Sequence, residues 1–162
     1  MNWNWPKLQV HLAEEPDHWS EAQTLFREYA ESLDYELEHQ RIHEEIKTLP
    51  GVYAAPAGCV LLAREGEAFV GCVALRKLEE GVCEMKRLYV TPDAQGRGIG
   101  RSLVHRVTRE ALGMGYKRMR LDTIPSMRSA RRLYHAFGFR EIESYRDDSM
   151  EGTMFMELML SM

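Results

Sequence analysis

The chain has 162 residues, enough for one domain with a continuous core, and its 44% hydrophobic and 28% charged content is typical of a globular protein. A net charge of −4 without any Lys/Arg-rich run argues against a nucleic-acid partner. No apolar stretch approaches the roughly 20 residues that cross a bilayer, and residues 1–6 do not read as a signal peptide, so we expect a cytoplasmic protein with no membrane partner. Three cysteines without close pairing fit a reducing compartment.

The first half of the chain predicts a strand, two helices and three further strands. Residues 8–13 alternate as a strand. Ser20 and Gln23 have the spacing of a capping box, and the apolar residues after them recur every three or four positions, which predicts an amphipathic helix. A second, more polar helix is expected over residues 39–48, ended by Pro50. The three strands are expected over residues 58–64, 68–77 and 82–91, the first two joined by a tight turn at 65–67.

The second half predicts two helices alternating with three strands. The glycine-rich turn at residues 96–100 opens a helix whose apolar positions recur at helical spacing. A strand over residues 117–123 precedes a helix that starts near Pro125 and ends at Gly138 with a left-handed cap. The last strands are expected over residues 139–145 and 153–160. The order βααβββαβαββ is typical of a mixed α/β sheet, which we expect to form a single domain over residues 1–162.

The strongest chemical signal is the segment 88–100, LYVTPDAQGRGIG, in which a strand, a glycine-rich turn and a helix start follow one another. Glycines let the backbone approach a ligand, and the first N–H groups of a helix attract phosphate. A dinucleotide-binding G-x-G-x-x-G and a phosphate-binding P-loop both fail on spacing, because the glycines fall as G-x-G-x-G and no lysine follows. The residues themselves therefore predict an anion site of another kind.

This segment resembles the pyrophosphate loop of GNAT-superfamily acyl-CoA N-acyltransferases, Q/R-x-x-G-x-G/A, whose positions Gln95, Gly98 and Gly100 fill. A second block of that family, A-x-x-L-Y-x-x-x-G-F, is matched by residues 130–139. Both blocks stand in the family's order, and the resemblance covers about residues 58–145. It implies the GNAT fold, a mixed and mostly antiparallel sheet of about seven strands flanked by about four helices.

The resemblance implies an N-acetyltransferase that passes an acetyl group from acetyl-CoA to a primary amine of a small molecule or peptide, by direct attack in a ternary complex. The alternative is a non-catalytic acyl-CoA-binding regulator with the same fold; a cofactor-free scaffolding protein is a third hypothesis. A longer acyl donor stays open. No metal is expected, because His39 and His43 lack an obvious third ligand. Members of this family often form homodimers through their terminal strands.

The resemblance also assigns the cofactor to the loop and the strand before it. The backbone N–H groups of residues 97–101 are expected to face the pyrophosphate. The strand backbone is expected to hold the acetyl oxygen where the family's fourth and fifth strands splay apart. For the arginines of this set, a solvated helix start is an equal alternative. The expected cofactor-binding residues are Leu88, Tyr89, Val90, Gln95, Gly96, Arg97, Gly98, Ile99, Gly100 and Arg101.

Two residues are the catalytic candidates. Tyr134 occupies the family's tyrosine position near the CoA sulfur, which implies a general acid; a packed core tyrosine is the alternative. Glu84 lies six residues before Val90, so regular alternation predicts that both share a strand face with Leu88, and the resemblance implies a general base there. The alternative for Glu84 is an ion pair with a nearby Lys or Arg. Cys83 is then expected to be a buried core residue on the opposite face.

The acceptor side is the least specified part. Glu28 and Tyr35 belong to an acidic helix–loop–helix region that resembles the acceptor border of the family, and Tyr145 is expected on its other side; a solvent-exposed charged surface is the alternative. One position departs from the family, where an asparagine is common and Met127 stands here. Ser126 either replaces its hydrogen bonds or caps the following helix, and capping is the favoured interpretation.

Overall fold

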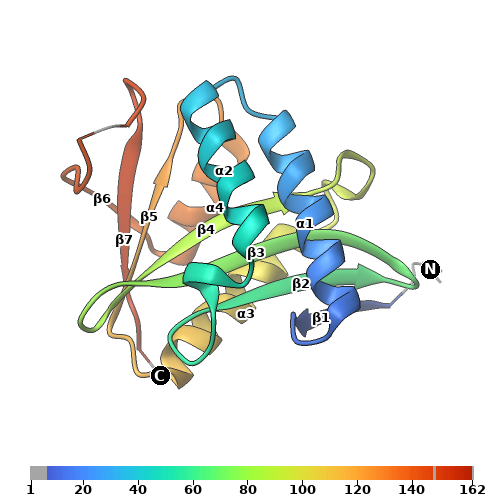
Figure 1. The fold of residues 1–162 in the computed structure, drawn as a ribbon. Helices are drawn as coiled ribbons and strands as arrows, with labels where there is room; N and C mark the ends of the chain where they lie inside the picture. Colours follow the sequence, from blue (N-terminus) through green and yellow to red (C-terminus); the bar gives the residue numbers. More distant parts are fainter. Residues whose placement is uncertain (1–6, 148, 162) are drawn as a thin grey trace, which may run out of the picture.

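The computed structural model describes residues 7–147 and 149–161, so the expectation about residues 1–6 lies outside the described residues. The described elements follow the predicted order and confirm the predicted fold class (Figure 1). No helix among them is long and apolar enough to cross a membrane. The helices are α1 (Pro16–Glu31), α2 (Glu36–Thr48), α3 (Ile99–Gly113) and α4 (Arg128–Phe137). The strands are β1 (Leu8–Leu12), β2 (Cys59–Glu65), β3 (Ala68–Glu79), β4 (Val82–Val90), β5 (Arg118–Thr123), β6 (Arg140–Ile142) and β7 (Met154–Met159).

The sheet has the order β1-β2-β3-β4-β5-β7-β6, and every neighbouring pair is antiparallel except β4 and β5. The parallel pairing of β4 with β5 is short, because it joins only residues 82–84 to residues 118–120. Beyond these residues the two strands diverge, as Figure 1 shows. The splay expected from the resemblance is therefore confirmed, and it opens the middle of the sheet.

Hydrophobic side chains pack on both faces of the sheet. Along β3, Val73 and Leu75 point toward a core closed by α3, whereas Cys72 and Ala74 point toward a second core closed by α1 and α2. The helices occupy opposite faces of the sheet in Figure 1. Burial on both faces explains why these strands read as apolar runs rather than as alternating ones.

Strand β4 carries a β-bulge at Arg87. Its φ of +60° lies in the left-handed region that residues with a side chain rarely occupy. The register with β3 shifts at this point, since Cys72 pairs with Tyr89 while Ala74 pairs with Lys86. The extra residue reverses the alternation of side chains along the rest of the strand.

The bulge overturns one prediction. Cys83 and Met85 belong to the core under α3, and Leu88 and Val90 pack against that same core despite their even numbers. Glu84 therefore lies on the opposite face from Leu88 and Val90, and the prediction of a shared face is wrong. Regular alternation failed because nothing in the residue pattern announces a bulge at an arginine.

Two helix starts differ from the predictions. Helix α1 begins one turn before Ser20: the Glu15 side chain accepts from the backbone of His18, and the Glu15 N–H donates to His18 Nδ1 at 3.4 Å. Ser20 instead donates to the carbonyl of Pro16. Helix α4 begins after Met127 without a side-chain cap, so Ser126 is not its cap.

Arg87 ties α2 to the sheet beside the splay. Its side chain is 4% exposed. Nε and Nη2 donate to the two carboxylate oxygens of Glu45 at 3.0 and 2.7 Å, and Nη1 donates to Glu38. Tyr53 donates its hydroxyl to Glu45 at 2.8 Å. One guanidinium thus holds two carboxylates of the same helix, and it fixes α2 over the open part of the sheet.

We expect Arg87→Met to lower the free energy of unfolding by about 3 kcal/mol, because it removes the buried cation that bonds to two partly buried carboxylates. Chemical denaturation of the variant and the parent protein measures the difference. Arg109→Gln, which removes a positive charge from an exposed position of α3, is the matched control and should change stability by less than about 0.5 kcal/mol. Equal losses in the two variants would contradict a structural role for the Arg87 pairs.

Candidate active site

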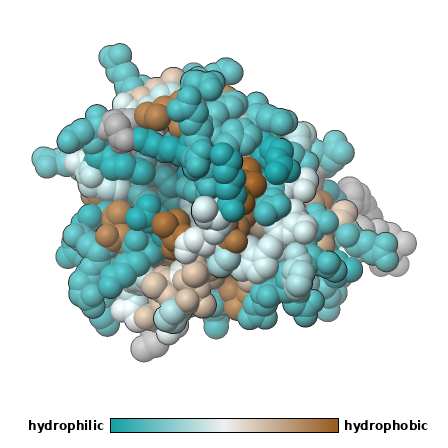
Figure 2. Space-filling model, in the orientation of Figure 1, coloured by the Kyte–Doolittle hydropathy of each residue, from teal (hydrophilic) through white to brown (hydrophobic). Residues whose placement is uncertain are grey.

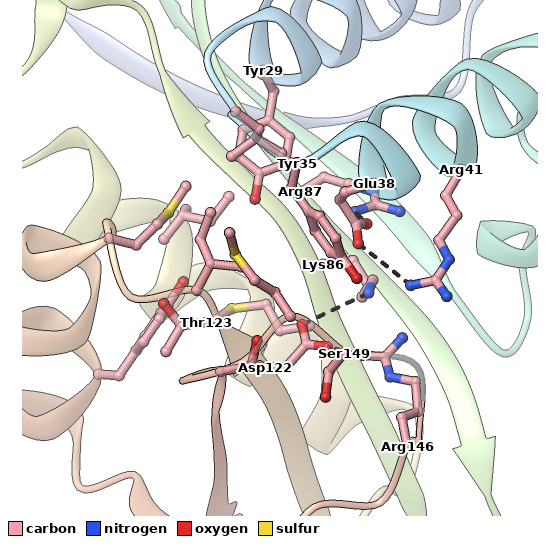
Figure 3. A pocket seen from close by; sticks show the side chains of 18 residues that line it. Tyr29, Tyr35, Glu38, Arg41, Lys86, Arg87, Asp122, Thr123, Arg146 and Ser149 are labelled. Atoms are coloured by element: carbon pink, nitrogen blue, oxygen red, sulfur yellow. Dashed lines mark hydrogen bonds and ion pairs between the residues drawn. The ribbon is translucent and has the colours of Figure 1, made fainter.

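A cavity occupies the opening between β4 and β5 (Figure 3). Five segments form it: the region from α1 to α2, the second half of β4, the end of β5, helix α4, and the segment before β7. Figure 2 shows that the molecular face carrying α1 and α2 is largely hydrophilic, with only small hydrophobic patches. The lining residues are Tyr29, Leu33, Tyr35, Glu38, Arg41, Met85, Lys86, Arg87, Leu88, Asp122, Thr123, Ile124, Met127, Tyr134, Arg146, Ser149, Met150 and Thr153.

Tyr134 lies in the wall of this cavity together with Leu88 of β4. Its side chain is almost fully buried, and its ring packs against Phe139 with the ring centroids 5.7 Å apart. Burial raises the pKa of Tyr134 well above its ordinary value, and the negative charge of Asp122 acts in the same direction. The hydroxyl therefore keeps its proton at any physiological pH.

The glycine loop forms the start of α3 at the same end of β4. Gly96 and Gly98 have φ values of +83° and +81°, and a Cβ on either would meet nothing within 4 Å. The N–H of Ser102 donates to the carbonyl of Gly98, which is the first hydrogen bond of α3. The N–H groups of α3 that precede Ser102 therefore have no acceptor within the helix. The first turn holds no acidic side chain that would compete for them. These features suit an anionic ligand.

The side chains of the loop are placed by contacts with the sheet. Gln95 donates to the carbonyl of Val90 at 3.0 Å, which closes the loop onto the end of β4. Arg97 forms an ion pair with Glu65 of β2 at 2.8 Å, whereas Arg101 is exposed. A Cβ on Gly100 would touch Val90 and the Leu133 side chain of α4, which places the start of α3 beside the opening of the sheet.

Glu84 lies behind the cavity rather than in its wall. It is 1% exposed and is absent from the lining. Its Oε2 accepts from the Tyr145 hydroxyl at 2.8 Å and from Arg146 Nη2 at 3.1 Å, and Oε1 has no hydrogen-bond partner among the described side chains. Glu84 therefore forms an ion pair, as the alternative interpretation expected. Its partner is Arg146, which lies 62 residues further along the chain.

The predicted acceptor residues separate in space. Tyr35 lines the cavity. Glu28 lies outside the lining and accepts from the Tyr89 hydroxyl at 3.4 Å. Tyr145 also lies outside it, where its hydroxyl donates to Glu84 and its ring makes an edge-to-face contact with Phe155 at a centroid distance of 5.0 Å. Met127, at the family's asparagine position, is part of the wall and packs against the core under α1.

Sequence reasoning missed the charged groups that face the cavity. Lys86, Asp122 and Arg146 meet there from β4, from β5 and from the segment before β7. Arg146 bonds to both Glu84 and Asp122, and Lys86 Nζ lies 3.9 Å from Asp122. Lys86 and Asp122 are charged residues within predicted strands, but Arg146 lies outside any strand, and nothing in the local pattern showed that the three converge.

The remaining nucleophiles and ligands are poorly placed for chemistry. Burial raises the pKa of the Cys83 thiol to about 12, so it stays protonated, as expected for a core residue. Within residues 7–147 and 149–161, no group of three or more His, Cys, Asp or Glu side chains is arranged to hold a metal ion. His39 contacts the carbonyl of Leu33.

Comparisons with known proteins agree with this geometry. Residues 16–139 match the acetyltransferase (GNAT) family. An N-acetyltransferase of Schizosaccharomyces pombe is 32% identical over 156 residues, which are 95% of this chain and 96% of that one. A GNAT-family acetyltransferase of Staphylococcus aureus has a similar structure, with a TM-score of 0.79, 18% identity and coverage of 96% and 100%. The protein yncA of Salmonella typhimurium, solved with its cofactor acetyl-CoA, has a TM-score of 0.70, 20% identity and coverage of 95% and 94%.

The position of Glu84 leads to a stability prediction. Glu84→Gln should lower the free energy of unfolding by about 1–3 kcal/mol, because Arg146 then loses the buried one of its two carboxylate partners. The control is Glu80→Gln, which alters a carboxylate whose side chain is 96% exposed and should have almost no effect. Denaturant titration of both variants tests this, and a Glu84→Gln protein as stable as the parent would refute the pairing.

Proposed function

The chain belongs to the acetyltransferase (GNAT) family, and on that premise we propose that it transfers an acetyl group from acetyl-CoA to a primary amine of a small molecule or peptide, by direct attack in a ternary complex. The observation that carries the proposal is the juxtaposition of the glycine loop at the start of α3, the open edge of β4 and the buried hydroxyl of Tyr134. These are the three parts that such a transfer requires.

The loop supplies the phosphate site. The backbone N–H groups of residues 97–101 would hold the pyrophosphate, and the open space over Gly96 and Gly98 leaves room for it. Arg97 and Arg101 would add charge at the rim of this site. The pantetheine arm would then run along the edge of β4 that β5 leaves unpaired. Acetyl-CoA in the similar structure of yncA supports this choice of cofactor.

The acetyl group would meet the amine inside the cavity. Backbone N–H groups of residues 88–90 would stabilise the oxyanion that forms as the amine attacks the thioester carbonyl. Tyr134 would give its proton to the departing CoA thiolate, because its hydroxyl lies in the cavity wall and is protonated at the start of each turnover. The products are the acetylated amine and free CoA.

A carboxylate in the wall would accept the proton that the amine loses. Glu84 does not face the cavity, so we assign it to holding Arg146 in position. The lining carboxylates are Glu38 and Asp122. Burial alone would raise the pKa of Glu38, but Arg87 and Lys86 lower it below its ordinary value, which makes Glu38 a poor base. Asp122, which also bonds to Arg146, is the other carboxylate of the lining and our candidate base, directly or through water.

A regulator that binds acyl-CoA without turnover remains the alternative function. The chain retains Tyr134 in the cavity wall, and a protein that only binds its cofactor has no need for a buried proton donor there. Released thiol in the presence of acetyl-CoA and an amine panel distinguishes the two functions.

Tyr134→Phe tests the transfer chemistry. We expect kcat to fall by about 100-fold or more, the usual contribution of a positioned general acid, while the Kd for acetyl-CoA stays within about twofold. Thiol release and calorimetry measure the two quantities. Tyr116→Phe is the control, because that tyrosine bonds the carbonyl of Ala57 away from the cavity. Unchanged kcat in Tyr134→Phe would remove Tyr134 from the mechanism.

Gly98→Ala tests the cofactor site. A Cβ at φ +81° strains the loop by about 1–2 kcal/mol and projects into the space assigned to the pyrophosphate, so we expect acetyl-CoA affinity to fall by about tenfold or more. Gly113→Ala makes the same chemical change at the far end of α3, where a Cβ also meets nothing within 4 Å, and should leave affinity unchanged. Calorimetric titration with acetyl-CoA, and with NAD as a negative control, decides between them; equal affinities would place the cofactor elsewhere.

A further inference from the structure

Lys86 presents a buried positive charge to the cavity. Its side chain is 6% exposed, and its Nζ lies 3.9 Å from Asp122, too far for a hydrogen bond. No other partner of this ammonium group is found among the described residues. An ammonium group has three donors, and a buried one without acceptors is costly. The Lys86 ammonium group is therefore available to an acceptor that enters the cavity, and a negatively charged acceptor would bind it best.

The guanidinium groups of Arg41 and Arg146 line the same cavity as this ammonium group. In Figure 3 the nitrogen-bearing ends of Arg41, Lys86 and Arg146 lie on the same side of the cavity. The three residues also line a second, shallower hollow that adjoins the first, so they stand at the passage between the two. Arg146 Nε is buried and has no hydrogen-bond partner among the described side chains. Two elements thus bring cationic side chains to the wall of the same cavity.

The charges at the cavity wall do not balance. Four cationic residues line the cavity, namely Arg41, Lys86, Arg87 and Arg146, against the two carboxylates of Glu38 and Asp122. Glu45 and Glu84 lie outside that lining, where they bond to Arg87 and Arg146. With these two included, each arginine has a carboxylate within 3.6 Å, and Lys86 alone has none that close. The lining alone thus carries two more cations than carboxylates, and Glu45 and Glu84 behind it bring the count to four of each.

We propose that the acceptor amine also carries a carboxylate, which binds to Lys86 between Arg41 and Arg146 while the amine faces Tyr134. This inference rests on the proposed function and names the class of its second substrate, a small amino acid. One carboxylate can accept from the one ammonium group of this cavity that has no acceptor within hydrogen-bond distance in the described part of the chain. Both ends of the substrate must fit one cavity, because Lys86 and Tyr134 both line it.

The electrostatics of Lys86 agree with this arrangement. Burial lowers its pKa, and repulsion from Arg87 and Arg146 lowers it further, against the attraction of Asp122 and Glu84. A carboxylate bound beside the ammonium group would raise this pKa and favour the charged form. Glu38 and Arg41, which face the same space from α2, complete the set of charged neighbours.

The experiment compares matched pairs of acceptors. Each of the twenty amino acids, with β-alanine and γ-aminobutyrate, is assayed beside its carboxamide, with thiol release as the readout. The amide keeps the amine, lowers the amine pKa and removes the carboxylate, so any preference for the acid runs against intrinsic reactivity. We expect kcat/KM for the preferred acid to exceed that of its amide by about tenfold or more, the value of one charge-assisted contact.

The Lys86→Met variant tests whether Lys86 causes the preference for the acid over its amide. We expect KM for the preferred acid to rise by about tenfold, kcat to change by less than about threefold, and the difference between acid and amide to shrink. Arg41→Gln, at a half-exposed position, should have the same effect to a smaller degree and guards against a folding defect in Lys86→Met. Arg109→Gln makes the matched change of charge on α3 and should leave the preference intact. A kcat that falls equally for acid and amide in Lys86→Met would make Lys86 a base and overturn the proposal.

A binding arm separates this inference from the proposed function. With CoA present, the N-acetyl derivative of an amino acid should raise the melting temperature more than its N-acetyl amide does, and Lys86→Met should abolish the difference. Turnover of amines with no preference for the acid would refute the carboxylate site and leave the transferase intact. Absence of turnover with every amine, together with selective stabilisation by the N-acetyl acids, would refute the transferase and leave the carboxylate site intact.

Discussion

The short parallel pairing between β4 and β5 is the constraint on which the rest of the structure depends. Three residue pairs hold the two halves of the sheet together, and beyond them the strands separate. A sheet that opens in its middle exposes backbone groups and side chains of both strands to a common space. Elsewhere such groups would be paired within the ladder. The cavity, its tyrosine and the start of α3 all lie where this pairing ends.

An opening of this kind must be held by contacts other than a β-ladder, and here charged groups supply them. Arg87 joins β4 to two carboxylates of α2, and Arg146 joins the segment before β7 to Glu84 of β4 and Asp122 of β5. Each arginine bridges elements that the splay would otherwise leave apart. Buried ion pairs contribute little net stability compared with apolar packing, but they are directional. They therefore set the width of the opening and the orientation of the groups that line it.

Features that depend on neighbouring residues could be predicted from the sequence, whereas features that depend on distant residues could not. Gly138 as a left-handed cap, the glycine turn before α3 and the order of elements depend on neighbouring residues, and they could be predicted. The face of Glu84 could not, because a bulge at Arg87 reverses the alternation and its left-handed backbone occurs at a residue type that gives no sign of it. The convergence of Lys86, Asp122 and Arg146 depends on three separate elements. Local patterns identified the cofactor loop, whereas the acceptor side required the folded arrangement.

This division has a physical origin. A pyrophosphate is held by backbone N–H groups of one turn and one helix start, so consecutive residues form its site and a local sequence pattern can identify it. The acceptor substrate is held by side chains that reach a shared cavity from α2, β4, β5 and the segment before β7. No single segment of the sequence therefore identifies its site. Apolar side chains at these positions would stabilise the fold at least as well as buried charges do. Retention of an ammonium group without a close partner, at the passage into the cavity, is therefore better explained by what enters the cavity than by what holds it together.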